Sequence, residues 1–257
     1  MNNVAVLVKK EWKEYLKEFR IFWLPIAFIG IGIMQPVTMK MLPKLVGGEV
    51  SGLIIDPNAA IQSGNQIFSG TFTQFNQFGL IITVVALMGA VAKERSEGVL
   101  DILFSKPVGK GSYLFSKYFS NSILLTISLI IGSLAGVYYT NIYYSNVNMK
   151  MFIKALSLYG LWFLFIVTAA IFFSSIAKSQ IQAAALTLGL CFLLVIIGGQ
   201  SNNILEIINP SYLSSAAELV MQGNNLPGNL IYTSGFCLLY IEVMYISSYL
   251  IMKKLDK

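Results

Sequence analysis

The sequence predicts an all-α, polytopic membrane protein with six transmembrane helices, an N-terminal interfacial amphipathic helix and a re-entrant hairpin before the last span. Hydrophobic residues make up 56% of the 257 residues and charged residues only 12%, with a mean hydropathy of +0.69. Soluble domains carry about 25% charged residues. The chain also contains six apolar runs near the ~20 residues that a bilayer requires. We place the spans at residues 21–42, 75–92, 120–140, 153–177, 183–199 and 230–251 of a single domain covering 1–257.

Residues 1–20 have the pattern of an amphipathic helix rather than of a cleaved signal peptide, in which an apolar core directly follows a short basic region. Glu11 is the one charged residue on the otherwise apolar face, which consists of Val4, Leu7, Val8, Trp12, Tyr15, Leu16 and Phe19. Such a helix lies flat in the interface, with its aromatic rings at headgroup level and its lysines toward anionic lipid. A passive anchor and a mechanical role are both open for it.

The basic residues predict the orientation of the chain. Fourteen of the eighteen Lys and Arg residues fall on the side of the N-terminus, and residues 200–229 contain none. By the positive-inside rule, both termini are cytoplasmic. The net charge of +6 follows from this rule and from attraction to an anionic inner leaflet. No nucleic-acid partner is expected, because the basic residues are spread over four segments and form no groove with stacking aromatics.

The residue inventory excludes most catalytic chemistry. The sequence has no histidine and no CxxC pair, and Cys191 and Cys237 fall inside predicted spans. Catalysis by His, zinc sites of the HExxH type and His-ligated haem are therefore excluded. The GxxxxGK[ST] phosphate loop is also absent from the sequence. We expect no catalytic residue, no metal site and no cofactor in this chain, which does not hydrolyse ATP itself. The sequence has sixteen Lys against two Arg, together with many Ile and Asn, which is typical of an AT-rich bacterial genome.

Two features stand out within the predicted spans. Ser128, Gly132 and Gly136 form a stripe of small residues that lets helix backbones approach. Gly30 and Gly32 in the first span, and Gly198 and Gly199 at the end of the fifth, could do likewise. Packing within the chain is the favoured interpretation, and a dimer face is the alternative. Glu242 is the one acidic residue near the middle of a span. Either it handles a proton, a cation or substrate, or it is a neutral carboxylic acid hydrogen-bonded to a neighbouring helix. The second interpretation is favoured, because no other buried charge is available for a relay.

The two long segments on the other side of the membrane differ. Residues 43–74 are rich in Gly, Ser, Asn and Gln, which predicts a loop. Residues 201–228 contain two short, partly apolar helical patterns around the Asn209-Pro210 break. This second segment predicts a hairpin that dips back into the outer leaflet, where protein or a cavity must receive it.

The polar loop at residues 93–117 has the order of a docking helix. Glu94, Glu97 and Asp101 are spaced to share one helical face. Pro107 is expected to end the helix, and Ser112 to cap the next one. Another face carries the apolar residues Val99, Leu100, Leu103 and Phe104. Since anionic headgroups repel carboxylates, we expect the acidic face to contact a protein groove rather than lipid.

The run KERSEGVLDILFSKPVGK at residues 93–110 resembles the signature that follows the second span of ABC-2 type transporter permeases, roughly E-R-E-x-G-T-L-E-x-L-L-x-x-P-V-x-R. The departures are one extra residue between Arg95 and Glu97, Val99 in place of Thr, and Lys110 in place of Arg. The matching positions are Glu94, Arg95, Glu97, Gly98, Leu100, Asp101, Leu103, Pro107, Val108 and Lys110.

The resemblance implies a permease subunit of an ATP-binding cassette transporter in the bacterial cytoplasmic membrane. A separate cytoplasmic ATPase would bind ATP and dock on the 93–117 loop, with residues 178–182 as a smaller contact. A second permease chain, identical or related, would complete the transporter, and the apolar bundle favours export of an amphipathic substrate. Two alternatives stay open: a gradient-driven secondary transporter that uses Glu242, and a non-transporting membrane anchor or regulatory subunit for an ATPase.

Overall fold

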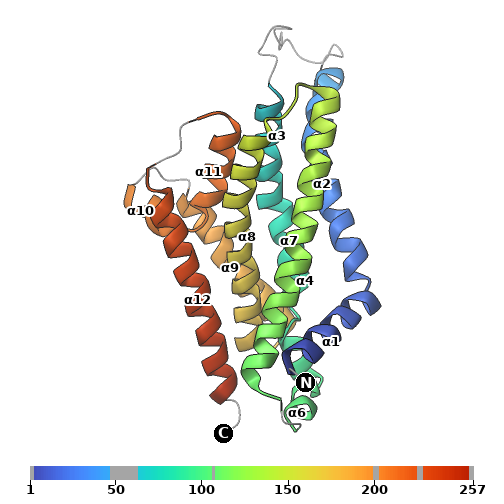
Figure 1. Cartoon of the computed structure of the whole chain (residues 1–257), viewed down its shortest axis with the longest axis vertical. Coiled ribbons are helices and arrows are strands. Elements are labelled where there is room, and N and C mark those ends of the chain that lie inside the picture. The colour runs from blue at the N-terminus through green and yellow to red at the C-terminus, as the bar shows by residue number, and fades with distance from the viewer. Residues whose placement is uncertain (1–2, 47–62, 106–107, 199–202, 225–227, 255–257) are drawn as a thin grey trace.

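The computed structural model describes residues 3–46, 63–105, 108–198, 203–224 and 228–254 (Figure 1). Within these ranges the chain forms helices and no strands, which confirms the all-α class. The elements are α1 (Asn3–Lys17), α2 (Arg20–Val46), α3 (Gly64–Gln74), the π-helix η1 (Phe75–Gly79), α4 (Leu80–Leu87), α5 (Ala92–Ser96), α6 (Val99–Phe104), α7 (Lys110–Tyr143), α8 (Met149–Ile176), α9 (Gln180–Gly198), α10 (Asn203–Ile208), α11 (Tyr212–Met221) and α12 (Leu230–Lys254).

Six stretches of these helices are long and apolar enough to cross a membrane, in agreement with the predicted number. They are Arg20–Met41, Gly64–Ser96, Lys110–Tyr143, Met149–Ile176, Gln180–Gly198 and Leu230–Lys253. α1, α6 and the C-terminal end of α12 lie at one end of the bundle, called here the α1 end, whereas α3 and α11 lie toward the opposite end, called the α11 end (Figure 1).

Helix α8 forms the centre of the bundle. It contacts α4, α7, α9, α11 and α12, and Trp162, Ile166 and Ala170 on it are fully buried. α9 and α12, by contrast, are mostly exposed, with only 17% of their most apolar stretches buried within the chain. The outer surfaces of these two helices are therefore left for lipid or another chain.

The small-residue stripe packs within the chain, as the favoured interpretation predicts. A Cβ atom at Gly132 would lie 2.5 Å from the carbonyl oxygen of Phe28, and one at Gly136 would lie 2.8 Å from that of Gly32. A Cβ at Gly32 would overlap the carbonyl oxygen of Gly132. The backbones of α2 and α7 approach this closely only because these residues are glycines.

The prediction of a loop over 43–74 is wrong for residues 43–46, which belong to α2, and for residues 64–74, which form α3; residues 47–62 lie outside the described residues. Ser63 caps α3 in a capping box with Gln66, a signal obscured by the polar composition. Phe68 and Phe72 are fully buried, because residues four apart share one face of a helix. α3 therefore continues through η1 and α4 as part of one long membrane-crossing element.

Residues 203–221 form two short helices around Asn209-Pro210. α10 contacts α9 and α12, whereas α11 packs on α3, α8 and α12. Asn209 Nδ2 and Ser211 Oγ both donate to the carbonyl oxygen of Leu194, at 2.7 and 2.8 Å. These bonds fasten the turn between the helices to α9. Entry of the pair into the membrane as a re-entrant hairpin stays a prediction.

Candidate functional site

The predicted docking segment is two short helices rather than one. Gly98 adopts a left-handed conformation, with φ 70°, which separates α5 from α6. Glu94, Glu97 and Asp101 consequently do not share one face. Glu94 points inward and is 5% exposed, whereas Glu97 and Asp101 are exposed. The acidic face predicted from the spacing is therefore wrong for Glu94 and holds only for an exposed pair.

The carboxylate of Glu94 is the centre of a buried ionic cluster. The ammonium group of Lys117, on α7, lies 3.0 Å from Glu94 Oε1. Lys10, on α1, donates to the same oxygen, and the Tyr113 hydroxyl donates to Oε2. Lys117 also lies 2.9 Å from Oε2 of Glu11. Glu14 lies 3.7 Å from Lys10. We name Lys10, Glu11, Glu14, Glu94, Tyr113 and Lys117 the ionic junction; it connects α1, α5 and α7.

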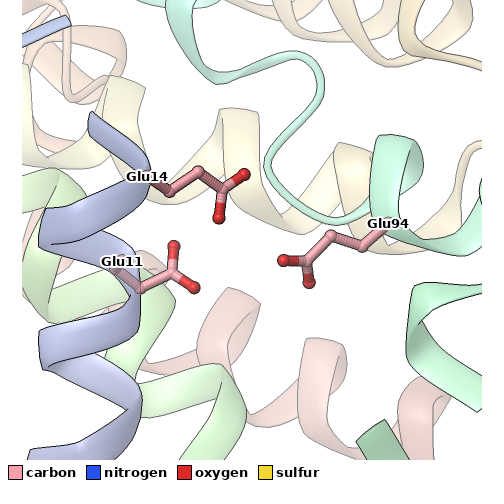
Figure 2. A group of neighbouring side chains, drawn as sticks. All are labelled: Glu11, Glu14 and Glu94. Atoms are coloured by element: carbon pink, nitrogen blue, oxygen red, sulfur yellow. The ribbon is translucent and has the colours of Figure 1, made fainter. Parts of the chain in front are cut away.

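Three carboxylates meet at this junction, as Figure 2 shows: Glu11 and Glu14 of α1 point across toward Glu94. One oxygen of each lies within 4.8 Å of those of the other two. Such a cluster has the ligand type of a cation site. The two lysines already supply the positive charge, because Lys10 lies 3.5 Å from Glu11 and 3.7 Å from Glu14. We therefore interpret the cluster as an ion network and not as a metal centre.

The junction explains why a glutamate interrupts the apolar face of α1. That face packs on α7, where Leu7 and Tyr15 are buried, and Glu11 is 2% exposed among them. Burial raises the pKa of Glu11, although the Lys117 ammonium opposes this shift. For Lys10, burial lowers the pKa, but the hydrogen bond to Glu94 and the negative charges of Glu94, Glu11 and Glu14 together outweigh it, so the net shift is upward. α1 is thus held by protein contacts along this face.

Further polar contacts fix α5 to α8. Arg95 donates from Nη2 to the carbonyl oxygen of Ser175 at 2.6 Å and from Nη1 to that of Ala177 at 3.4 Å. The hydroxyl of Ser174 accepts from the backbone N–H groups of Val91 and Ala92, both at 3.0 Å. These bonds satisfy backbone groups at the break between α4 and α5, which otherwise are unpaired.

A second ion pair ties α5 to the start of α2. Lys93 lies 2.9 Å from Glu18, which also pairs with Arg20. α5 is consequently bound on one side to α1 and α2 and on the other to α8. A displacement of α5 cannot occur without straining at least one of these helices.

α6 presents a different surface. Leu100 is 6% exposed and packs inward, and the ring of Phe104 packs edge-on against Tyr113 at 5.7 Å between centroids. Leu103 is partly buried against the core. Ile102, in contrast, is 68% exposed, next to the exposed Asp101. The predicted apolar stripe therefore anchors α6 to its own chain, and the free face is formed by Glu97, Asp101 and Ile102.

The end of this segment differs from the prediction at one position. α7 begins at Lys110 after the N-cap residue Gly109, so Ser112 lies inside the helix and does not cap it. Pro107 lies outside the described residues, and its predicted role as a helix stop stays a prediction.

Glu242 lies on an exposed side of α12, in a groove of about 430 Å³ that Tyr118, Leu164 and Tyr245 also line. Within the described part of the chain, no hydrogen bond or ion pair reaches its carboxylate. The hydrogen bond expected from a neighbouring helix is thus not formed among the described residues. A functional role for Glu242 stays a prediction.

Sequence reasoning missed Lys10, Glu11, Glu14, Tyr113 and Lys117 as members of a site. The one available signal was Glu11, a charged residue alone on an apolar helical face. The sequence places Lys117 at the end of the polar loop, whereas in the structure it lies within α7 and is 3% exposed.

Comparison with known families decides the class of this chain. Its residues 5–251 match the domain described as ABC-2 family transporter protein. The chain belongs to the ABC-2 transporter family. Members of this family are membrane subunits of transporters, not themselves catalytic, and generally work with an ATPase partner. The resemblance seen in residues 93–110 is thereby confirmed at the level of the family.

A relative supports the same assignment. The chain is 34% identical over 193 residues to the protein named Uncharacterized transmembrane protein YxlG, from Bacillus subtilis (strain 168). The alignment covers 74% of this ABC-2 chain and 74% of that protein.

Proposed function

We propose that this chain is the permease subunit of an ATP-binding cassette exporter for an amphipathic substrate. A separate cytoplasmic ATPase docks on the 93–117 loop and drives it. Both chain termini then lie in the cytoplasm of a bacterium, and the α1 end is the cytoplasmic end. A second permease chain, identical or related, completes the transporter.

One observation carries this proposal: an exposed helix is attached to the membrane bundle through buried ions. α6 lies at the tip of the α1 end (Figure 1), and its free face is exposed. The adjoining α5 is bound through Glu94 and Arg95 to α1, α7 and α8. Buried charge pairs of this kind tolerate little change in geometry, because separating them leaves an uncompensated charge.

The free face of α6 defines what the ATPase groove must offer. Glu97 and Asp101 favour basic residues at its rim, and Ile102 favours an apolar floor. Movement of the ATPase would push α6 and α5 together, and the ionic junction would pass this movement to α1 and α7. Rigid-body movement of helices is a common form of such transitions. The N-terminal helix thereby acquires a mechanical role besides that of an anchor.

The test uses two exposed residues of the docking segment, Glu97 and Ile102. Leu100 is unsuitable because its replacement would disturb the core. We therefore combine Glu97→Lys with Ile102→Asp, co-express the chain with the ATPase encoded beside it, and measure co-purification and ATP hydrolysis in proteoliposomes. We expect at least about a tenfold loss of bound ATPase, since interface anchors each contribute upward of ~1 kcal/mol.

A matched control places the same kinds of change at the α11 end, as Asn146→Lys with Ser215→Asp, both at exposed positions. This control should keep the ATPase bound. Undiminished binding by the Glu97/Ile102 variant would overturn the assignment of the docking face. Transport that stops with an uncoupler and ignores ATP would instead favour the gradient-driven alternative through Glu242.

A further inference from the structure

Glu218, on α11, is a further acidic residue that is partly buried, far from the ionic junction. The hydroxyl of Thr73, on α3, donates to Glu218 Oε1 at 3.0 Å. In the described ranges no Lys or Arg pairs with it. Restricted access to water disfavours the ionised form of a carboxyl group that has one donor and no cation, so the neutral form is favoured.

Glu218 is the middle member of a row of contacts along one side of α11. Ser214, Glu218 and Gln222 recur every four residues and so share one face. Each contacts a polar side chain across the interface. Asn76 Nδ2 donates to Ser214 Oγ at 2.8 Å, and Gln222 Nε2 donates to Ser69 Oγ at 3.4 Å. We name these two contacts and the Thr73–Glu218 contact between them the polar ladder.

The ladder is built into the core of the bundle. Asn76 lies in the π-helix η1, and its Oδ1 accepts from Trp162 Nε1 of α8 at 2.9 Å. π-helical turns are rare and frequently occur at functional sites. The side chain of Asn76 forms hydrogen bonds to both α8 and α11. The interface of α11 with α3 and η1 is therefore connected to the central helix α8 through Asn76.

The ionisable groups on the helices packed against α11 form no ion pair with Glu218 among the described residues. Glu218 is therefore the group of the ladder that titrates. α3 contains no ionisable residue. On α8, Tyr159 is fully buried, and among the described residues no hydrogen-bond partner reaches its hydroxyl. Lys150 and Lys154 of α8 are exposed and make no ion pair with it in the described chain. On α12, Tyr232 near the α11 end is 64% exposed.

We propose that the polar ladder is a proton-operated latch, in which protonated Glu218 keeps α11 seated on α3 and ionised Glu218 releases it toward water. The ligand of this site is a proton. Under the proposed function, on which this orientation rests, the α11 end faces the outside, so the latch reads the external pH and controls the outer end of the transport path.

The direction of the pH effect follows from linkage. Burial raises the pKa of Glu218, and the hydrogen bond from Thr73 opposes this only in part. The seated state therefore binds the proton more tightly than a released state in which Glu218 meets water. The free-energy preference for the seated state over the released state is fully present below the ordinary pKa of Glu. This preference is lost as the pH rises through the raised pKa of seated Glu218.

The latch can be tested on the permease alone, without the ATPase, so that its failure is separable from a failure of the proposed function. Cys191 and Cys237, both buried, are first replaced by Ala. Single cysteines are then introduced as Ala217→Cys, at a fully buried position of α11, or as Ser215→Cys, at an exposed one. A membrane-impermeant maleimide labels each variant in nanodiscs between pH 5 and 8.

The ratio of the two labelling rates cancels the intrinsic pH dependence of the thiol. We expect this ratio to rise with pH, by up to about tenfold for each unit by which the pKa is raised. Glu218→Gln mimics the protonated form and should make the ratio low and independent of pH. Glu206→Gln, a carboxyl of α10 outside the ladder, should leave the rise intact.

Thr73→Val provides a second test, which does not require the Glu218→Gln variant to fold. It removes the one donor to the ionised carboxylate, so the rise should move to higher pH. A ratio that does not change with pH in the Glu218 chain would overturn the proposal. An equal rise in Glu218→Gln, or an unshifted rise in Thr73→Val, would overturn it as well.

Discussion

Replacement of Lys117 by Met is the most direct perturbation of the ionic junction. Lys117 is 3% exposed and lies 2.9 Å from Glu11 and 3.0 Å from Glu94. Methionine keeps much of the length of the side chain and removes the charge. Two buried carboxylates then share Lys10 as their only remaining cation. Removing one member of a buried ion pair costs about 3–5 kcal/mol, because the other charge stays buried without compensation.

The charge count of the junction allows a sharper version of this experiment. Glu11, Glu14 and Glu94 face Lys10 and Lys117, which leaves one net negative charge. Lys117→Met makes it two, and the added change Glu11→Gln restores one. We therefore expect the double variant to be more stable than Lys117→Met alone, although it carries one more substitution.

The measurement is the free energy of unfolding in mixed micelles, titrated with SDS and followed by tryptophan fluorescence. Lys178→Met is the matched control, because Lys178 is exposed on the turn between α8 and α9; it should change stability by less than about 0.5 kcal/mol. The reasoning is refuted if Lys117→Met is as stable as this control, or if Glu11→Gln destabilises the Lys117→Met chain further.

Two further predictions concern glycines. Gly132→Ala should destabilise the chain by about 1–3 kcal/mol, because its Cβ would lie 2.5 Å from the carbonyl oxygen of Phe28. Gly160→Ala, with no atom within 4 Å, should be neutral or stabilising by up to ~1 kcal/mol in the same SDS titration; equal stability of the two variants would contradict the close approach of α2 and α7. Gly98→Ala should cost roughly 1–2 kcal/mol through its positive φ alone and speed amide hydrogen exchange in α6. Unchanged exchange would show that the left-handed turn does not hold α6.

Much of the fold was predictable because it depends on composition and on local spacing. The bilayer requires long apolar helices, so the six spans were visible as six apolar runs. The stripe of Ser128, Gly132 and Gly136 indicated a close helix contact, because small residues spaced four apart lie on one face of a helix. The loop prediction failed over α3, because the polar residues there hid two phenylalanines at helical spacing and a capping box at Ser63.

The site was predictable only in part. The position of the docking segment followed from the charges between two apolar runs, and its family pattern was recognisable at residues 93–110. The direction in which each side chain points was not. One residue, Gly98, changes the backbone direction, so that a spacing rule valid for a continuous helix no longer relates Glu94 to Asp101.

The sequence by itself determined that this protein is a six-span helical membrane subunit of the ABC-2 family, because apolar runs and a contiguous motif are properties of the chain in order. Only the tertiary structure decided what Glu94 does. Its partners Lys10 and Lys117 lie 84 and 23 residues away along the chain. The same holds for Glu218 and Thr73, which are separated by 145 residues. Whether a carboxylate is a solvated surface charge or a buried, partnered group depends on which helices pack together, and no local pattern specifies that packing.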